Sequence, residues 1–303
     1  MKRNNWLYVS LLGVLLFSCH RTEKKTKVTE TRTAGETTIL VDESFSRILD
    51  QQIQVFTSDY PEAKVHTLPG NEARIIPELY KGKLGMIVLS RLLSPSEERY
   101  FKQKQIPVVA DRFAIDGIAL ITHQQSTDTT ITVQEVFDIL KGKGEGKRRL
   151  VFDNAASSTV RYFLESAGVK QLPSSGVYTL NTSNDVIKYV AESKDYFTIG
   201  LVGVNWLMAN SSEMQGYLSD VKAMGVKDLP GKKGDDAFYK PTQNNLINGV
   251  YPFLRNIYII NCEGKNGLGT GFANWLSSPR GQLIVLKSGL GPHKMVSREF
   301  NLK

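Results

Sequence analysis

The sequence predicts an α/β fold in which parallel strands carry helices on both faces, and two observations support this. Short β-rich runs alternate with segments whose apolar residues recur at helical spacing, the order that builds such a sheet. One extended stretch, residues 107–122, is too long for an ordinary strand, so we expect the chain to pass there from one lobe into a second. A length of 303 residues allows one large domain or two medium ones, and 41% hydrophobic residues is ordinary for a globular protein.

The first part of the chain predicts strands and helices in alternation. Apolar residues at helical spacing begin at Ile48, and this helix ends before Pro61. Ser94 followed by Pro95 is typical of a helix start, because Ser caps free N–H groups and Pro fits the first helical position. The other expected elements here are strands at 37–41, 63–68 and 84–89 and a helix at 71–80.

The second part continues the same pattern after the crossing stretch. Residues 141–149 are basic and Gly-rich and are expected to form a flexible loop. The expected elements are helices at 132–140, 157–166, 183–192 and 271–277 and strands at 150–152, 197–204 and 257–260.

The N-terminus predicts export. Lys2 and Arg3 precede an apolar run, residues 6–17, that is too short to span a bilayer comfortably, which is typical of a secretory signal. The run ends in Leu-Phe-Ser directly before Cys19, which resembles the lipobox of bacterial lipoproteins, where the Cys is acylated with lipid such as palmitate. We expect a lipoprotein signal peptide over 1–18. The alternative is an uncleaved anchor helix with an incidental Cys, and both interpretations place the body outside the cytoplasmic membrane.

Residues 19–36 are almost all polar, so we expect a flexible tether. The formal charge of +8 falls to +6 without Lys2 and Arg3, which suits an anionic ligand or a membrane surface. The charge is spread along the chain and forms no basic patch interleaved with aromatic residues, so nucleic-acid binding is not expected. With Cys19 acylated, Cys262 is a lone cysteine, expected to be a small buried hydrophobe.

A residue with a small hydroxyl side chain lies in the turn between each of three expected strands and the helix that follows it. These residues are Ser44, Ser90 and Ser157. In an open α/β sheet, ligands bind beyond the carboxyl ends of the strands, where helix N-termini offer free N–H groups to an anion. Ser and Thr are also the preferred helix caps, so one such turn alone indicates nothing about function. Three of them, with Arg91 beside the second, favour an oxyanion site.

Several segments together resemble the phosphate-binding proteins of bacterial phosphate ABC transporters, the PstS type. The resemblance runs from Thr37 to the end of the chain, and it implies a periplasmic-binding-protein-like fold: two lobes, each a mixed sheet flanked by helices, with a ligand cleft between them. It implies one lobe at 37–118 plus 240–303 and the other at 119–239. The motifs are Ser44-Phe45, Ser90-Arg91-x-Leu93, Ile115-Asp116-Gly117-Ile118-Ala119, Ser157-Ser158-Thr159 (Ser-Gly-Thr in the family), Gly200-Leu201-Val202-Gly203, Tyr251-Pro252-x-x-Arg255 and Tyr258-Ile259-Ile260.

The resemblance also implies which residues hold the anion. Arg91 would add a bidentate pair to two phosphate oxygens. Ser158 replaces the family's Gly and crowds its loop, and Arg161, two positions past that motif, is expected on a helix surface. The phosphate donors would be the side chains of Ser44, Ser90, Ser157, Ser158 and Thr159 and the N–H of Phe45.

A carboxylate would accept the proton of HPO4 and repel sulfate, which carries none at neutral pH. Asp116 and Asp153 are the two alternatives for this acceptor. Asp153 stands where many members have Arg, and Arg91 stands where many have Asp, so acid and base are hypothesised to have exchanged places. Asp42 and Glu43 are expected to point to solvent or to adjust lobe closure.

We therefore expect an extracytoplasmic, lipid-anchored, monomeric solute-binding protein that captures inorganic phosphate for an ABC permease. The four histidines show no metal-ligand spacing and no nucleophile-elbow motif occurs, so we expect no enzyme activity, metal or cofactor. The alternatives are the same fold with another oxyanion or a phosphorylated metabolite, or a surface lipoprotein in signalling or adhesion.

Overall fold

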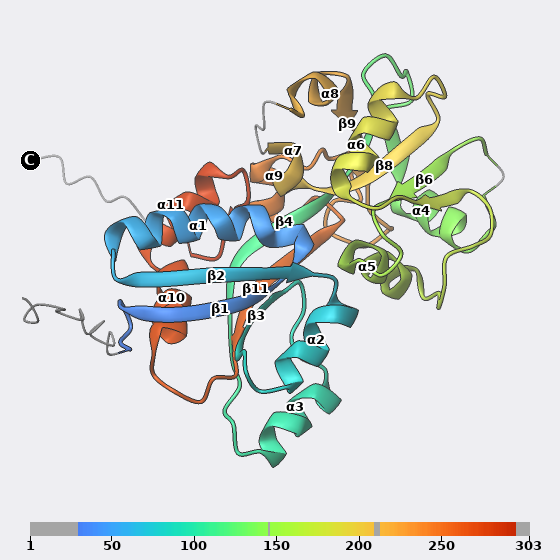
Figure 1. The fold of residues 1–303 in the computed structure, drawn as a ribbon. Coiled ribbons are helices and arrows are strands. Elements are labelled where there is room, and N and C mark those ends of the chain that lie inside the picture. The colour runs from blue at the N-terminus through green and yellow to red at the C-terminus, as the bar shows by residue number, and fades with distance from the viewer. Residues whose placement is uncertain (1–29, 145, 209–212, 295–303) are drawn as a thin grey trace, which may run out of the picture.

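The computed structural model describes residues 30–144, 146–208 and 213–294. Across these ranges one ten-stranded sheet runs through both lobes, and two short strands form a second sheet. Figure 1 shows one lobe around β1 and β2 and the other around β6 and β8, which confirms the two-lobe α/β fold. The main path follows the order β2 (Ala63–Gly70), β1 (Gly35–Asp42), β3 (Met86–Leu89), β11 (Leu254–Asn261), β4 (Val109–His123), β8 (Thr198–Gly203), β6 (Arg149–Phe152) and β7 (Val177–Thr179).

The strand β4 joins the two lobes. Its first part, up to Gly117, pairs antiparallel with β11, and its last part, from Ile118, pairs antiparallel with β8. The extended stretch expected over 107–122 is thus confirmed as one crossing strand of 15 residues. Because β4 belongs to both halves of the sheet, it fixes where the ends of the other strands meet.

The sheet of the first lobe is covered on both faces. Successive strand residues point to opposite faces, so Ile39 and Val41 of β1 join one apolar cluster and Leu40 joins the other. Residues of α1, α10 and α11 belong to the first cluster and residues of α2 and α3 to the second. Figure 1 shows α1 and α11 on one side of β2, with α2 and α3 on the other. These helices are α1 (Ser46–Asp59), α2 (Glu72–Tyr80), α3 (Pro95–Gln103), α10 (Leu268–Leu276) and α11 (Pro279–Lys287).

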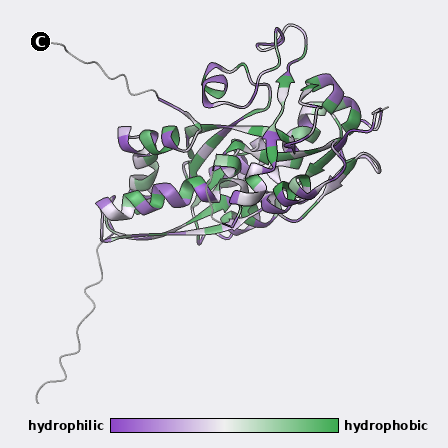
Figure 2. Cartoon of the chain, turned by 90° about the horizontal axis from the view of Figure 1, so that it is seen from above, coloured by the Kyte–Doolittle hydropathy of each residue, from purple (hydrophilic) through white to green (hydrophobic). Residues whose placement is uncertain are grey.

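In the second lobe a helix lies unusually close to a strand. A Cβ placed on Gly200 of β8 would come within 2.8 Å of side-chain carbons of Val186 and Val190, so only a residue without a side chain allows this approach. Figure 2 shows hydrophobic stretches along the strands of both lobes, with helices that alternate between hydrophobic and hydrophilic residues. The helices of this lobe include α4 (Val133–Leu140), α5 (Ser158–Ala167) and α6 (Ser183–Glu192).

Most expected elements are confirmed to within a few residues. The helix at 183–192 is α6, and Ser94 caps α3 with a full capping box. β1 begins at Gly35, two residues before its expected start. The elements that were not predicted are mainly short, because two to six residues are too few to show a period. These are β5 (Thr130–Thr132), β7, α7 (Val204–Met208), α8 (Gln215–Ser219), β9 (Val221–Ala223), β10 (Gly225–Lys227), α9 (Gln243–Asn248), β12 (Gly291–Pro292) and the longer α11.

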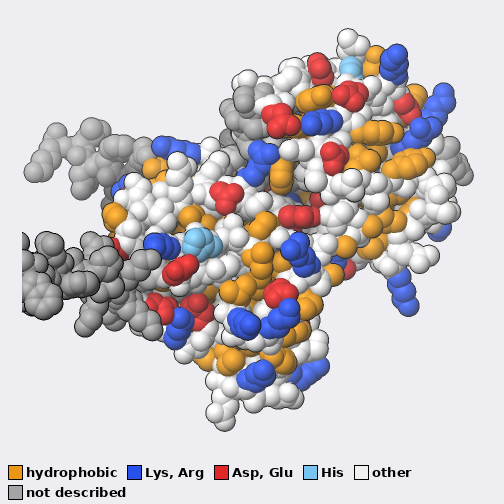
Figure 3. Space-filling model, viewed as in Figure 1, with side chains coloured by type: hydrophobic (Ala, Val, Ile, Leu, Met, Phe, Trp, Pro, Cys, Tyr) orange, Lys and Arg blue, Asp and Glu red, His pale blue; other side chains and the backbone are white. Residues whose placement is uncertain are grey.

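The expected signal peptide over 1–18 and the acylated Cys19 lie outside the described residues. The expected tether, 19–36, is described from residue 30 onward, where Glu30 pairs with Lys265 Nζ at 2.7 Å. None of the helices in the described ranges has both the length and the apolar character needed to cross a membrane. Figure 3 shows positive and negative side chains interspersed over the face drawn, in line with the dispersed charge of the sequence.

Phe56 tests the core of the first lobe, because its ring is 1% exposed and packs against Phe272 and Trp275. We expect Phe56→Ala to lower the free energy of unfolding by about 3–5 kcal/mol. The same change at Phe238, which is 45% exposed, should cost less than about 0.5 kcal/mol. Urea unfolding of both variants measures the two losses, and equal losses would show that this cluster is not the core.

Candidate functional site

The end of β1 enters the first helix through a short 3-10 turn, η1 (Glu43–Phe45). Oδ1 of Asp42 accepts a hydrogen bond from the backbone N–H of Ser44 at 3.0 Å and so caps this turn. Asp42 is 1% exposed, and Ser44 and Phe45 are buried with it. The expectation that Asp42 points to solvent is therefore wrong, because the carboxylate folds back over the turn that it caps.

The start of α5 supplies the hydroxyls of the second lobe. Ser157 caps this helix: its Oγ accepts from the backbone N–H of Val160 at 3.2 Å and donates to the Asp153 carboxylate. Ser158 and Thr159 follow in the first turn and are buried. The hydroxyl of Ser157 is thus already engaged, whereas the next two hydroxyls face the first lobe.

The two lobes meet at these turns. Ser44 Oγ lies 3.4 Å from Ser158 Oγ, although the two residues are 114 positions apart. The indole N–H of Trp206 donates to the carbonyl of Ser44 at 3.1 Å, and the amide of Asn154 donates to the Glu43 carboxylate. Glu43 therefore makes a contact between the lobes, while its expected role in lobe closure stays a prediction.

Arg255 of β11 lies at the centre of the arrangement. Its side chain is 1% exposed, and Nε donates to Oδ2 of Asp116 at 2.8 Å. Nη1 donates to Ser158 Oγ at 3.4 Å and Thr159 Oγ1 at 3.3 Å, and the guanidinium lies 4.7 Å from the Phe45 ring centroid. Nη2 is buried and makes no hydrogen bond within the described ranges. Arg255 stands in the Tyr-Pro-x-x-Arg motif, to which no binding role was assigned from the sequence, and that motif is the signal that could have identified it.

The two carboxylates proposed as proton acceptors have different surroundings. Asp116 is fully buried and forms the ion pair with Arg255; burial raises its pKa, and the guanidinium opposes this rise. Burial raises the pKa of Asp153 to about 6, against the opposing effects of the Ser157 hydroxyl and Arg255. Each acid therefore already has a partner in the protein.

The structure does not bring Arg91 into this cluster. Its Nε pairs with Glu72 at 2.8 Å and its Nη1 with Glu97 at 2.7 Å, so two acids of the first lobe hold it. Ser90 instead accepts from Nη2 of Arg161 at 2.9 Å, and the same Nη2 lies 3.0 Å from Glu72. Arg161, expected on a helix surface, therefore reaches from α5 across to the first lobe.

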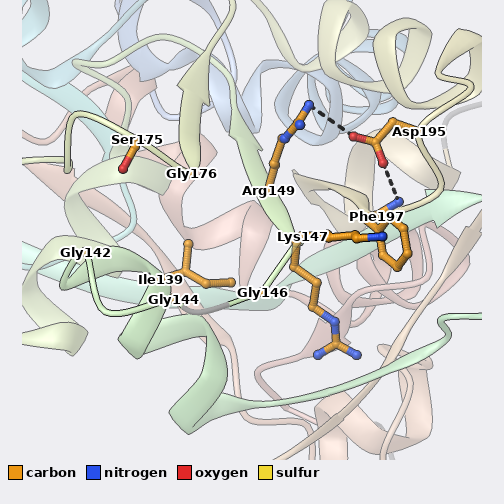
Figure 4. Close-up of a pocket in the computed structure, with 11 residues that line it drawn as sticks. Ile139, Gly142, Gly144, Gly146, Lys147, Arg149, Ser175, Gly176, Asp195 and Phe197 are labelled. Carbon is orange, nitrogen blue, oxygen red and sulfur yellow. Dashed lines mark hydrogen bonds and ion pairs between the residues drawn. The ribbon is translucent and has the colours of Figure 1, made fainter.

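A separate groove lies in the second lobe, at the start of β6 (Figure 4). It lies away from the cluster, because Asp153 follows the opposite end of that strand. Arg149 pairs there with Asp195 at 3.1 Å, and Lys147 Nζ lies 5.4 Å from the Phe197 ring centroid. Both arginines that line it, Arg148 and Arg149, are already paired with acids, so this groove is a weaker candidate for an anion site than the cluster between the lobes.

The cluster offers the kind of donors that an oxyanion needs. Neutral hydroxyls and one buried guanidinium converge from both lobes, and such donors stabilise a desolvated anion without burying a large excess of positive charge. The predicted site residues that the structure brings together are Ser44, Phe45, Asp116, Ser158 and Thr159, with Asp153 and Ser157 beside them. Ser90 is not among them, because its Oγ accepts from Arg161 instead.

Comparisons with known proteins agree with this architecture. The phosphate-binding protein PstS of Pseudomonas aeruginosa is 23% identical over 285 residues, 86% of this chain and 83% of that protein. A substrate-binding protein from Clostridium perfringens, solved with bound phosphate, superposes with a TM-score of 0.69 at 20% identity over 86% of this chain and all of the other. An ABC-type phosphate transport receptor from Vibrio cholerae gives a TM-score of 0.63 at 21% identity, covering 85% and 100% of the two chains.

The family model described as the PBP superfamily domain matches residues 26–280. This range contains the second lobe, the crossing strand, most of the first lobe and every residue of the cluster. The chain therefore belongs to the PBP superfamily.

Proposed function

We propose that this protein captures inorganic phosphate between its lobes, outside the cytoplasm, and delivers it to the permease of an ABC importer. The observation that carries the proposal is the meeting of Ser44, Ser158 and Thr159 around a buried guanidinium whose Nη2 has no hydrogen-bond partner among the residues that the structure describes. Proteins similar in sequence and fold are named for phosphate binding and phosphate transport, which supports this ligand.

The guanidinium of Arg255 takes the role that the resemblance assigned to Arg91. A dianion removed from water needs several charge-assisted hydrogen bonds, and a planar guanidinium can serve two phosphate oxygens at once. Nη2 of Arg255 provides a donor for this purpose, while the hydroxyls of both lobes provide the neutral donors. Asp116 keeps the guanidinium paired and oriented before the anion arrives.

The lobes are assigned to 37–118 plus 240–303 and to 119–239, with a hinge in β4 near 116–122 and in the return segment near 238–243. The lipid on Cys19 would hold the protein, as a monomer, at the membrane surface from which it feeds the permease. We expect the protein to bind its ligand without catalysing a reaction.

Matched arginine variants test the proposed function by calorimetry with phosphate, sulfate and arsenate. Arg255→Lys should weaken phosphate binding by about 10–100-fold, because an ammonium cannot reproduce the planar fork. Arg91→Lys, the same change at the residue held by Glu72 and Glu97, should alter binding by less than about threefold. Wild-type protein that binds no phosphate would refute the proposal, and a loss confined to the Arg91 variant would refute the role of Arg255.

Asp153 makes stability depend on pH. Its pKa of about 6 exceeds the ordinary 3.8, so between these values the folded protein holds a proton that the unfolded chain has released. Its contribution to stability is therefore present at low pH and is lost as the pH rises through about 6. When the pH rises from about 4.5 to 7.5, the free energy of unfolding of Asp153→Asn should fall by about 1–3 kcal/mol less than that of the wild type. Urea unfolding at both pH values measures this, with the exposed Asp220→Asn as control, and parallel curves for Asp153→Asn and wild type would contradict it.

Arg161 tests lobe closure, since it bonds Ser90 and Glu72 of the opposite lobe. Arg161→Ala should leave the ligand-free protein more open, seen as a larger radius of gyration in small-angle X-ray scattering, and should weaken phosphate binding about 3–10-fold with unchanged selectivity. Arg149→Ala, whose ion pair with Asp195 lies within one lobe, should change neither quantity. Identical scattering and affinity for the two variants would rule out this closing contact.

A further inference from the structure

Trp206 is a residue of the second lobe whose side chain bonds to the first. It lies half-buried in α7, the short helix that begins directly after β8 ends. Its indole N–H donates to the backbone carbonyl of Ser44 at 3.1 Å, across 162 positions of the sequence. Ser44 belongs to η1, the turn that brings its own hydroxyl to Ser158. Trp206 therefore holds, from the opposite lobe, the turn that supplies the first lobe's hydroxyl to the anion cluster.

Arg47 of the first lobe covers the face of the same indole ring. Its guanidinium carbon lies 4.1 Å from the Trp206 ring centroid, and its Nη2 donates to Oδ1 of Asn184 at 3.4 Å. Arg47 belongs to α1 and Asn184 to the first turn of α6, so this side chain also joins the two lobes. A cation over the face of a Trp ring is attracted by it, and more strongly where water is excluded. The indole is thus held at its edge by Ser44 and on its face by Arg47.

The bond to the Ser44 carbonyl fixes a whole peptide group. A trans peptide is planar, so the carbonyl of Ser44 and the N–H of Phe45 lie in one plane and point in opposite directions. The N–H of Phe45 and the hydroxyl of Ser44 are both predicted donors to the anion. Holding the carbonyl therefore orients the first donor and fixes the backbone from which the second projects. Without the indole N–H, the turn would keep its cap from Asp42 but lose this bond to the second lobe.

We propose that Trp206 is a positioning residue for anion capture: its indole N–H, bonded to the carbonyl of Ser44, sets the donors of the first lobe against those of α5 when the lobes close. The inference rests on the proposed function, because it concerns the same site. Trp206 acts through the backbone of Ser44 and not by contact with the anion. In an open form the ring would lose both Ser44 and Arg47 and face water, so the surroundings of the indole should change when phosphate binds.

Matched tryptophan variants of the full chain test this role by calorimetry with phosphate. Trp206→Phe keeps an aromatic face for Arg47 but has no N–H for the Ser44 carbonyl, so phosphate binding should weaken by about 3–10-fold. Trp275→Phe, the same change at a ring that packs against Phe56 inside the first lobe, should leave the affinity within about twofold. Circular dichroism checks that both variants fold. A folded Trp206→Phe protein that binds phosphate as tightly as the wild type would overturn the inference.

Fluorescence gives a second readout that leaves Trp206 unchanged. The chain has three tryptophans, so a protein with Trp6→Phe and Trp275→Phe emits from Trp206 alone. Saturating phosphate should shift this emission to shorter wavelength, because contact with Ser44 and Arg47 removes water from the ring, whereas chloride at the same ionic strength should not. Unchanged emission in a protein that calorimetry shows to bind phosphate would refute the positioning role while the proposed function stands. Wild-type protein that binds no phosphate would overturn both.

Discussion

The buried ion pair between Arg255 and Asp116 is the interaction on which the site depends. The two residues are direct neighbours in the antiparallel register of β11 and β4, two positions before β4 begins to pair with β8 in the other lobe. A guanidinium removed from water costs several kcal/mol unless it is paired, so Asp116 stabilises a cation that could not otherwise be buried there. The pair leaves Nη1 directed at α5, and Gly203 makes room for Nη2, because a Cβ there would lie 2.8 Å from that nitrogen.

Capping chemistry explains why much of the site could be predicted from the sequence. Ser44 follows a strand in a short turn and Ser157 caps a helix, and each pattern is local enough to be read in a few residues. The order of strands and helices also follows from patterns within short segments. The crossing strand was predicted in this way, because its extended run is one continuous stretch of sequence. Arg255 was missed because its neighbours Asp116 and Ser158 are 139 and 97 residues away. Only the pairing of β11 with β4 brings them together.

Arg91 was wrongly expected to bind the anion because it is next to Ser90 in the sequence, whereas packing in the first lobe directs its side chain elsewhere. It follows Ser90 directly, but Glu72 at the start of α2 and Glu97 in the first turn of α3 both point at it. Two acids at helix N-termini hold the arginine in the first lobe. Their negative charges also interact favourably with the dipoles of these helices. The hypothesised exchange of acid and base between Asp153 and Arg91 is thus replaced by a different arrangement. The cation comes from the last long strand of the sheet, and the acids surround it.

The proposed anion position lies between the lobes, against the guanidinium of Arg255 and the hydroxyls of Ser158 and Thr159. A crystal structure of the protein grown with phosphate tests this position. We expect phosphate oxygens within hydrogen-bond distance, about 3 Å, of Arg255 Nη2 and of hydroxyls from both lobes. Phosphate bound instead at Arg91, or in the groove of Lys147 and Arg149, would contradict it.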